Sequence, residues 1–322
     1  MASTERVTNA HRNDLVNVHA DLLGWFAAHG RDLPWRRTRD PYAILVSEVM
    51  LQQTQVDRVL PKYAAFLAQF PTLVALADAP TAEVIRAWSG LGYNRRAVNL
   101  QRTARAVLSE HGGVFPRDVA ALRALPGIGP YTAGAVACFA FEQDVAFLDT
   151  NIRRVVQRVF VGPEAQGFAP EARLLDLAAQ VVPDSQGWHW NQAIMELGAL
   201  ICTAARPTCW RCPLQRDCQA YAAWRAADEQ AFEAPAVPMR QPRRVAERRE
   251  APYAGSNRFY RGRIIDVLRS LELGAQLGFG QLGPQVKPDF TPAEQEWLQV
   301  LVEALVGDGL LTFDGEHVCL PT

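Results

Sequence analysis

Four cysteines crowd into residues 202–218, with the spacing Cys202-x6-Cys209-x2-Cys212-x5-Cys218. A disulfide framework would spread its cysteines along a small secreted chain, whereas this chain has 322 residues and no apolar leader. Thiolates at this spacing can instead wrap one soft metal centre. Zinc usually takes two Cys-x2-Cys pairs or includes His, and this segment has one pair and no His nearby. An iron–sulfur cluster held by one loop therefore fits better, with zinc or metal-free thiols as the alternatives.

Most of the chain has the periodicity of α-helices, and strict strand alternation is scarce. The pattern predicts helices over 11–29, 170–181 and 189–202, with shorter ones between Pro and Gly residues from 41 to about 160. An apolar fraction of 49% suits a packed core, and no apolar run approaches the roughly 18 residues of a membrane helix. We therefore expect an all-α body in a soluble cytoplasmic protein without a membrane partner.

The last hundred residues have a different character. Residues 225–255 are polar and rich in Arg and Pro with no apolar period, which is typical of a linker. Beyond them we expect an amphipathic helix over 261–271, and Thr291-Pro-Ala-Glu294 is a capping-box start for a second helix. Residues 311–319 predict a hairpin around Asp314-Gly315. Two helices and a hairpin indicate a small winged-helix-like α+β module over 256–322.

The net charge of −1 hides local charges of opposite sign. Residues 240–269 carry nine Arg against three acids, and residues 270–322 carry eight acids against Lys287 alone. An even distribution would argue against nucleic-acid binding, but local fields of this kind leave it open.

A Pro126-Gly127-Ile128-Gly129 turn precedes a helical segment. Backbone N–H groups at a helix N-terminus suit a phosphate oxygen, and Gly127 and Gly129 would let a nucleic-acid strand approach the backbone. Many helix-turn-helix corners also use Gly-x-Gly, so a purely structural turn is the alternative.

With these two features the chain resembles the helix-hairpin-helix DNA glycosylase superfamily, and within it the MutY-type adenine glycosylases. The resemblance covers about residues 20–222 in matching order and spacing. Its motifs are Gly30-Arg-Asp-Leu-Pro-Trp-Arg36, Ser47-Glu-Val-Met-Leu-Gln-Gln-Thr-Gln55, Gly90-Leu-Gly-Tyr93, Leu125–Ala133, Leu148-Asp-Thr-Asn151, Asn191-Gln192 and the four cysteines. It implies a six-helix barrel with the helix-hairpin-helix over 35–145 and an iron–sulfur module built from 10–34 and 146–224. The linker over 225–255 and the C-terminal module over 256–322 depart from the family, because many members have a β-rich domain there that inspects the base opposite adenine.

The resemblance also implies roles for individual residues. Glu48 matches the general acid that protonates the leaving adenine, and Asp149 matches the carboxylate beside the sugar. The matched residues that assist catalysis are Tyr131 and Asn151, those that line the adenine pocket are Arg31, Leu33, Trp35, Arg36 and Gln192, and those that wedge into the base stack are Gln53 and Tyr93. Cys202, Cys209, Cys212 and Cys218 would hold one 4Fe-4S cluster. The sequence departs from many members at Thr150 and Asn94, neither of which is a catalytic position.

The chemistry of the two acids makes sense without the resemblance. Adenine is a poor leaving group, so a neutral carboxylic acid that protonates a ring nitrogen would speed its loss. Glu48 lies in an apolar run, where burial would keep a carboxyl group neutral. A carboxylate such as Asp149 would stabilise an oxocarbenium-like sugar. The structural alternatives are a lone acid on a helix face for Glu48 and a helix N-cap for Asp149.

The resemblance thus implies a DNA N-glycosylase of base excision repair that flips out and excises adenine mispaired with 8-oxoguanine or guanine in double-stranded DNA. Tyr131 stands where the endonuclease III branch has a Schiff-base Lys, and because a phenol forms no imine the enzyme should be monofunctional. A monomer associated with the nucleoid is expected. The rivals are a thymine or uracil mismatch glycosylase of the same superfamily and a non-catalytic iron–sulfur DNA-binding regulator.

Three roles are open for the C-terminal module. It could grip flanking duplex through Arg258, Arg261 and Arg263, which would add affinity without lesion choice. Its acidic end, residues 289–316, could instead pack on the body or on a partner protein. A solvated cap that helps stability is the third possibility.

Overall fold

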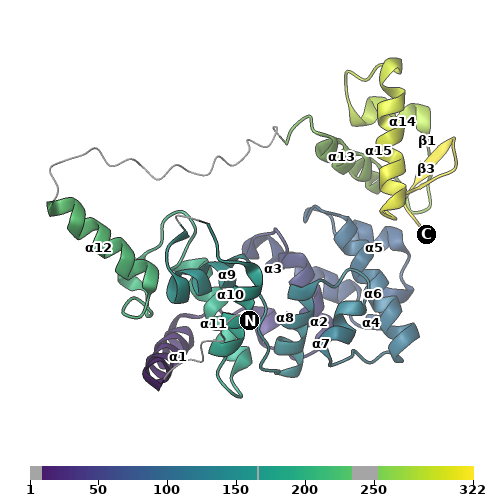
Figure 1. Ribbon diagram of the computed structural model, residues 1–322. Coiled ribbons are helices and arrows are strands. Elements are labelled where there is room, and N and C mark those ends of the chain that lie inside the picture. The colour runs from purple at the N-terminus through teal and green to yellow at the C-terminus, as the bar shows by residue number, and fades with distance from the viewer. Residues whose placement is uncertain (1–8, 165–166, 234–252) are drawn as a thin grey trace, which may run out of the picture. The chain divides into compact units, whose positions relative to one another are not determined.

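A computed structural model of the chain describes residues 9–164, 167–233 and 253–322 (Figure 1). The expected linker over 225–255 falls mostly on residues 234–252, which lie outside the described residues, and helix α12 (Gln219–Glu233) occupies its first part. The chain divides into two compact units. The first comprises the described parts of Met1–Pro41, Arg117–Val119 and Gly129–Arg243, and the second those of Tyr42–Pro116, Ala120–Ile128 and Arg244–Thr322.

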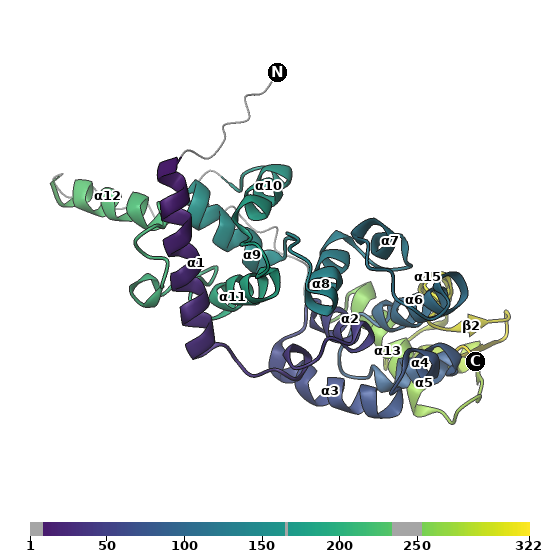
Figure 2. The ribbon, with the colours of Figure 1, turned by 90° about the horizontal axis from the view of Figure 1, so that it is seen from below.

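The first unit is helical. Its elements are α1 (Asn9–His29), η1 (Pro34–Arg36), α8 (Pro130–Phe141), α9 (Thr150–Val156), η2 (Gln157–Val161), α10 (Glu171–Val181), α11 (Gly187–Leu200), η4 (Cys209–Arg211) and α12. Helix α11 packs against both α9 and α1, which lie far apart in the sequence (Figure 2). The close approach of α9 and α11 requires Gly198, because a Cβ there would lie 2.7 Å from the Cβ of Asn151. The helices expected over 11–29, 170–181 and 189–202 are confirmed within a few residues.

The second unit begins with six helices, of which α4 and α5 pack against α6. These are α2 (Pro41–Leu51), α3 (Val56–Gln69), α4 (Leu73–Asp78), α5 (Thr81–Ala87), α6 (Arg95–His111) and α7 (Val119–Ala124). Buried Gln101 of α6 donates to the carbonyl oxygens of Leu76 (3.1 Å) and Ala79 (2.7 Å) and accepts from Thr81 (2.8 Å). It therefore satisfies the polar groups where α4 ends and α5 begins. In the described part of the chain, no helix is long and apolar enough to cross a membrane.

The C-terminal residues form a winged-helix-like module with the element order helix, strand, helix, helix and hairpin. The elements are α13 (Asn257–Ser270), β1 (Leu277–Gly278), α14 (Phe279–Val286), η5 (Pro292–Glu294), α15 (Gln295–Gly307), β2 (Thr312–Phe313) and β3 (His317–Cys319). The strands form an antiparallel sheet in the order β1-β3-β2. The capping box of Thr291 and Glu294 and the hairpin are confirmed. The fold class, an all-α body with a small α+β module, is confirmed as well.

Two elements of this module were not expected from the sequence, namely β1 and α14. Pro284 lies inside α14, which also contains Gly280 and Gly283, and these residues disfavour helices. Packing explains Gly283, because a Cβ at this position would lie 2.4 Å from the Phe290 ring.

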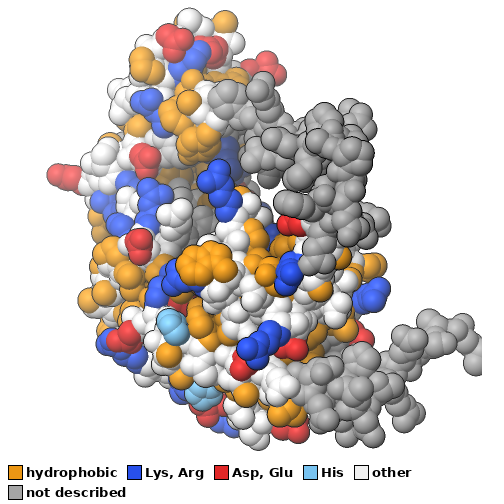
Figure 3. Space-filling view, turned by 90° about the vertical axis from the view of Figure 1, so that its left-hand side faces the viewer, with side chains coloured by type: hydrophobic (Ala, Val, Ile, Leu, Met, Phe, Trp, Pro, Cys, Tyr) orange, Lys and Arg blue, Asp and Glu red, His pale blue; other side chains and the backbone are white. Residues whose placement is uncertain are grey.

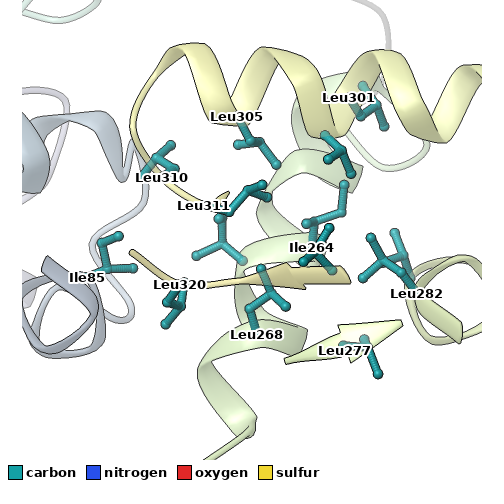
Figure 4. Close-up of a cluster of buried hydrophobic side chains, with 14 of the residues drawn as sticks. Ile85, Ile264, Leu268, Leu277, Leu282, Leu301, Leu305, Leu310, Leu311 and Leu320 are labelled. Carbon is teal, nitrogen blue, oxygen red and sulfur yellow. The ribbon is translucent and has the colours of Figure 1, made fainter. Parts of the chain in front are cut away.

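The module shares its hydrophobic core with helices α5 and α6. Buried Ala82, Ile85 and Val98 belong to the same cluster as the module's own apolar side chains. Figure 4 shows Ile85 beside this cluster, which includes Leu310 and Leu320. The backbone N–H of Ala82 also donates to the carbonyl oxygen of Pro321 at 2.8 Å. Residues 253–322 therefore pack onto α5 and α6. The hypothesis from the sequence assigned such packing to the acidic end, residues 289–316, in which Asp308 lies 3.4 Å from Arg95 of α6.

Candidate active site and metal centre

Glu48 lies on α2, which is buried along most of its length. The residues from Tyr42 to Met50 are all buried, and Glu48 itself is only 3% exposed. A carboxyl group in such a place costs stability, so it is unexpected unless it has a use. Its position is not that of an acid on a solvated helix face.

Asp149 is the N-cap of α9, in the first unit. Its Oδ1 accepts from the backbone N–H of Ile152 at 2.6 Å, and its Oδ2 accepts from the side-chain amide of Asn151 at 3.1 Å. Burial raises the pKa of Asp149 despite these hydrogen bonds, which favour the charged form. Tyr131 contacts the ring of Phe147 edge to face at 5.5 Å, two residues before Asp149. Asp149 is therefore a helix N-cap, as the structural alternative held. Its carboxyl group is also partly desolvated at the N-terminus of α9.

Arg154 holds Asn151 in place. The guanidinium of Arg154 donates to Oδ1 of Asn151 (2.8 Å) and to the carbonyl oxygens of Gly198 (2.7 Å) and Cys202 (2.7 Å). The side chain of Arg154 is buried, so its donors serve acceptors within the protein. Hydrogen bonds thus connect Asp149 through Asn151 and Arg154 to the start of the cysteine segment.

Arg31, Arg36 and Gln192 meet around a residue that sequence reasoning missed, Glu196. Arg31 donates to both carboxylate oxygens of Glu196 (2.7 and 3.0 Å), and Arg36 donates to Oε2 of Glu196 (2.8 Å) and to Oε1 of Gln192 (2.7 Å). Glu196 is 1% exposed. Burial would raise its pKa, but the hydrogen bonds from Arg31 and Arg36 outweigh burial and lower the pKa to about 2. Leu33 and Trp35, also expected in this group, are buried.

A signal for Glu196 was present in the sequence. It follows Gln192 by four residues on α11, so both side chains lie on the same helix face. An acid in an otherwise apolar helical segment indicates a buried partner of opposite charge.

Gln53 and Tyr93 are exposed, and both have a left-handed backbone conformation, with φ of +55° and +46°. Such values are uncommon for residues other than Gly, so the surrounding structure must hold them. Arg96 does so for both loops. It donates to the carbonyl oxygens of Val49, Met50 and Gln52 (2.7, 3.0 and 2.6 Å), to Oγ1 of Thr54 (3.3 Å), and to the carbonyl oxygens of Leu91 and Gly92 (both 3.1 Å). Burial lowers the pKa of Arg96 to about 10, which leaves it charged at neutral pH.

The predicted Gly-x-Gly turn connects α7 to α8. Gly127 has φ of +79°, and a Cβ there would lie 2.7 Å from the Cβ of Asn99. Gly129 is the N-cap of α8, with Pro130 at the first helical position. Thr103 donates to the carbonyl oxygen of Pro126 at 2.6 Å and so holds the turn on α6. The turn ends at the N-terminus of a 12-residue helix, where a phosphate oxygen can be bound.

The four clustered cysteines line one pocket, together with Arg158, Tyr221 and Trp224. Among the residues described, no group of three or more His, Cys, Asp or Glu side chains lies close enough to hold a single metal ion. Four cysteine thiols on one segment are the donor set that a 4Fe-4S cluster takes. Burial raises the pKa of Cys212 to about 12, and it also raises the pKa of Cys209 and of Cys218. Metal binding would therefore have to displace protons from these thiols.

Charge on the surface does not mark a binding face by itself. On the face shown in Figure 3, basic side chains are interspersed with acidic and hydrophobic ones. Two of the three Arg residues expected to grip DNA are engaged within the protein: Arg261 pairs with Asp308, and Arg258 contacts Tyr93.

Comparison with known proteins identifies relatives of this chain. Residues 46–177 match the HhH-GPD superfamily of base excision DNA repair proteins. An adenine DNA glycosylase of Mycolicibacterium smegmatis is 46% identical over 251 residues, which is 77% of this chain and 79% of that protein. The human adenine DNA glycosylase is 44% identical over 217 residues, which is 64% of this chain and 40% of that protein.

Solved structures agree with the fold. A thermostable thymine-DNA glycosylase superposes with a TM-score of 0.62 at 32% identity, over 67% of this chain and all of that chain. An endonuclease III in a non-covalent DNA complex superposes with a TM-score of 0.57 at 21% identity, over 70% of this chain and all of that one, which supports the fold alone.

Proposed function

Because the chain belongs to the helix-hairpin-helix family of base excision repair proteins, and within it to the adenine DNA glycosylases, we propose that it excises adenine with Glu48 as general acid and Asp149 as the carboxylate that stabilises the sugar. The observation that carries this assignment is that Glu48 is buried on α2 and that Asp149 is half-buried at the N-terminus of α9. Glu48 is 3% exposed, and burial raises the pKa of Asp149.

The proposed reaction breaks the bond between the sugar and adenine. The electron pair of the bond leaves with adenine, and Glu48 transfers its proton to a ring nitrogen of the departing base. The sugar becomes oxocarbenium-like, and the carboxylate of Asp149 stabilises its positive charge. Water then adds to the sugar carbon and loses a proton, which balances the proton that Glu48 gave to adenine, and an abasic site remains. Asn151 would keep Asp149 oriented, and Tyr131 would assist without forming an imine, so the enzyme is proposed to be monofunctional.

We propose that Arg31, Leu33, Trp35, Arg36 and Gln192 line the pocket for the extruded adenine. Arg36 donates to Oε1 of Gln192, which leaves the amide NH2 group of Gln192 to donate to an acceptor nitrogen of the base. The ion pairs with Glu196 restrict both Arg side chains, so the pocket wall would be formed before DNA binds. Gln53 and Tyr93 would wedge into the base stack, and the N–H groups near Gly127 and Gly129 would bind a phosphate.

We propose that the pocket lined by Cys202, Cys209, Cys212 and Cys218 holds one 4Fe-4S cluster. A bound cluster would brace the segment that carries it. Arg158 supports the same segment, because it donates to the carbonyl oxygens of Thr203 (2.7 Å) and Ala204 (3.2 Å).

The test is an excision panel on duplexes with A opposite 8-oxoguanine, A opposite G, and T or U opposite G, each followed by alkaline cleavage at the abasic site. Removal of A alone, from both mispairs, is the expected result. Glu48→Gln should lower the single-turnover rate at least about a hundredfold while duplex binding persists. The matched control is Glu110→Gln, which changes an exposed glutamate of α6. Excision of T or U in place of A, or a near wild-type rate for Glu48→Gln, would contradict the proposal.

A further inference from the structure

We propose that the C-terminal module acts on lesion recognition by positioning Tyr93 through Arg258, rather than by gripping DNA with its own basic surface. The inference rests on the proposed role of Tyr93 as a side chain that enters the base stack.

Arg258 contacts Tyr93 in two ways. Its Nη2 donates to the Tyr93 hydroxyl, and its guanidinium carbon lies 4.3 Å from the centre of the Tyr93 ring. The side chain of Tyr93 is 42% exposed and its backbone has a positive φ, so it needs such support to keep one orientation. Arg96 holds the backbone of the preceding residues Leu91 and Gly92, and its guanidinium carbon lies 5.6 Å from the Tyr93 ring centre. Arg258 lies closer to the ring and also donates to the hydroxyl.

Helix α13 positions Arg258 beside Tyr93. Ser256 caps α13 by accepting from the N–H of Phe259 at 3.2 Å, two residues from Arg258. At the other end of α13, Arg269 donates to the carbonyl oxygen of Ile85 (3.0 and 2.8 Å) and to Oδ1 of Asn94 (2.8 Å). The two ends of α13 therefore both contact the segment around Tyr93, one through Arg258 and the other through Arg269.

The shared core fixes the module on the body. Ile85, Ile264 and Leu268 are fully or almost fully buried in one cluster (Figure 4). Arg86 also donates to the carbonyl oxygen of Leu271 at 2.6 Å. The apolar burial and these hydrogen bonds together make the module a fixed part of the surface that carries Tyr93.

The charges of the module argue against a direct grip on DNA. Helix α15, which has the place of the groove-reading helix in a winged-helix domain, exposes Glu296 and Glu303. These carboxylates would repel phosphates. Arg261 is neutralised by Asp308, which also lies 3.4 Å from Arg95 of α6.

The first experiment measures hydrogen exchange of the amides of residues 90–94 without DNA, in Arg258→Ala, Arg258→Lys and Arg263→Ala. We expect Arg258→Ala to speed exchange several-fold, Arg258→Lys to restore protection only in part because an ammonium lacks the planar stacking group, and Arg263→Ala to leave exchange as in wild type. Unchanged exchange in Arg258→Ala would overturn the proposal.

The second experiment measures duplex affinity with an A·8-oxoguanine and an A·G mispair in a double-mutant cycle of Arg258→Ala and Tyr93→Phe. Arg258→Ala should weaken binding about five- to tenfold at the mispair, and clearly less in the Tyr93→Phe background. Equal losses in both backgrounds, with a strong salt dependence, would show that Arg258 acts directly on phosphates and would overturn the proposal. If wild type excised no adenine while exchange still responded to Arg258→Ala, the proposed function would fail and the positioning of Tyr93 would stand.

Discussion

Replacing Glu196 with Gln should cost about 3 kcal/mol of folding free energy at pH 7. The carboxylate is 1% exposed and lies between Arg31 and Arg36, whose side chains are 37% and 9% exposed. Its pKa is lowered from 4.5 to about 2, which corresponds to about 3 kcal/mol in favour of the folded, ionised state. Breaking a buried ion pair by removing one partner costs roughly 3–5 kcal/mol. Most of the lost free energy should come from Arg36, which would be left buried without its charged partner, whereas the more exposed Arg31 can turn to water.

The pH dependence of this loss has a definite sign. Because the pKa of Glu196 is lower in the folded chain than in the unfolded chain, its stabilisation is complete well above pH 4.5 and disappears as the pH falls toward 2. Between pH 7 and pH 4, the difference between wild type and Glu196→Gln should shrink by about 0.8 kcal/mol.

The assay is urea unfolding followed by tryptophan fluorescence, in anaerobic buffer, at several pH values between 7 and 4. The slope of unfolding free energy against urea should be the same for both proteins, so that the midpoints can be compared. Glu110→Gln, an exposed substitution on α6, should shift the midpoint very little. A loss below about 1 kcal/mol for Glu196→Gln, or a difference that grows as the pH falls, would refute the argument.

Three other predictions follow from the site. Asp149→Asn keeps the capping acceptor of α9, so it should unfold as wild type does in urea while its single-turnover excision rate falls at least about a hundredfold. Asp149→Ala should also lose about 1 kcal/mol of stability. Near wild-type excision by Asp149→Asn would remove this carboxylate from the mechanism. Gly127→Ala should cost about 1–3 kcal/mol in the same denaturation, because φ is +79° and the new Cβ meets Asn99, whereas Gly129→Ala meets nothing within 4 Å and should cost much less. Purified protein should contain about four irons per chain by metal analysis, Cys212→Ser should lower that content and Cys319→Ser should not; stoichiometric zinc without iron would contradict the cluster.

The sequence was sufficient for the elements that follow local rules. The capping box at Thr291 and Glu294, the hairpin at Asp314 and the helices over 11–29, 170–181 and 189–202 are where propensity and periodicity placed them. Helix α14 was not predicted, because Gly283 and Pro284 locally disfavour a helix. Only the packing of Phe290 over Gly283 shows why a glycine stands there.

The supporting residues of the candidate site could not be predicted in the same way. The motifs led to Glu48, Asp149 and the cysteines. Arg96 is half-buried and Arg154 is buried, and both donate to backbone carbonyl oxygens of other segments. An Arg in the sequence looks the same whether it is solvated or buried. Which backbone groups need its donors depends on tertiary structure, and these partners lie 44 to 48 residues away for Val49, Gln52, Gly198 and Cys202.

The pairing of Arg31 with Glu196 has a consequence for biosynthesis. The two residues are 165 positions apart, and α1, just before Arg31, buries Val18 and Leu22 in a unit that also needs α11. At roughly 5–20 residues per second, a ribosome takes about 8 to 33 s to make the intervening chain. During that time the apolar side of α1 has no α11 to pack against, and helices α2 to α6 of the second unit are synthesised. The first unit is thus completed only after helices α2 to α6 have been made, and its N-terminal helix needs protection from aggregation during that time.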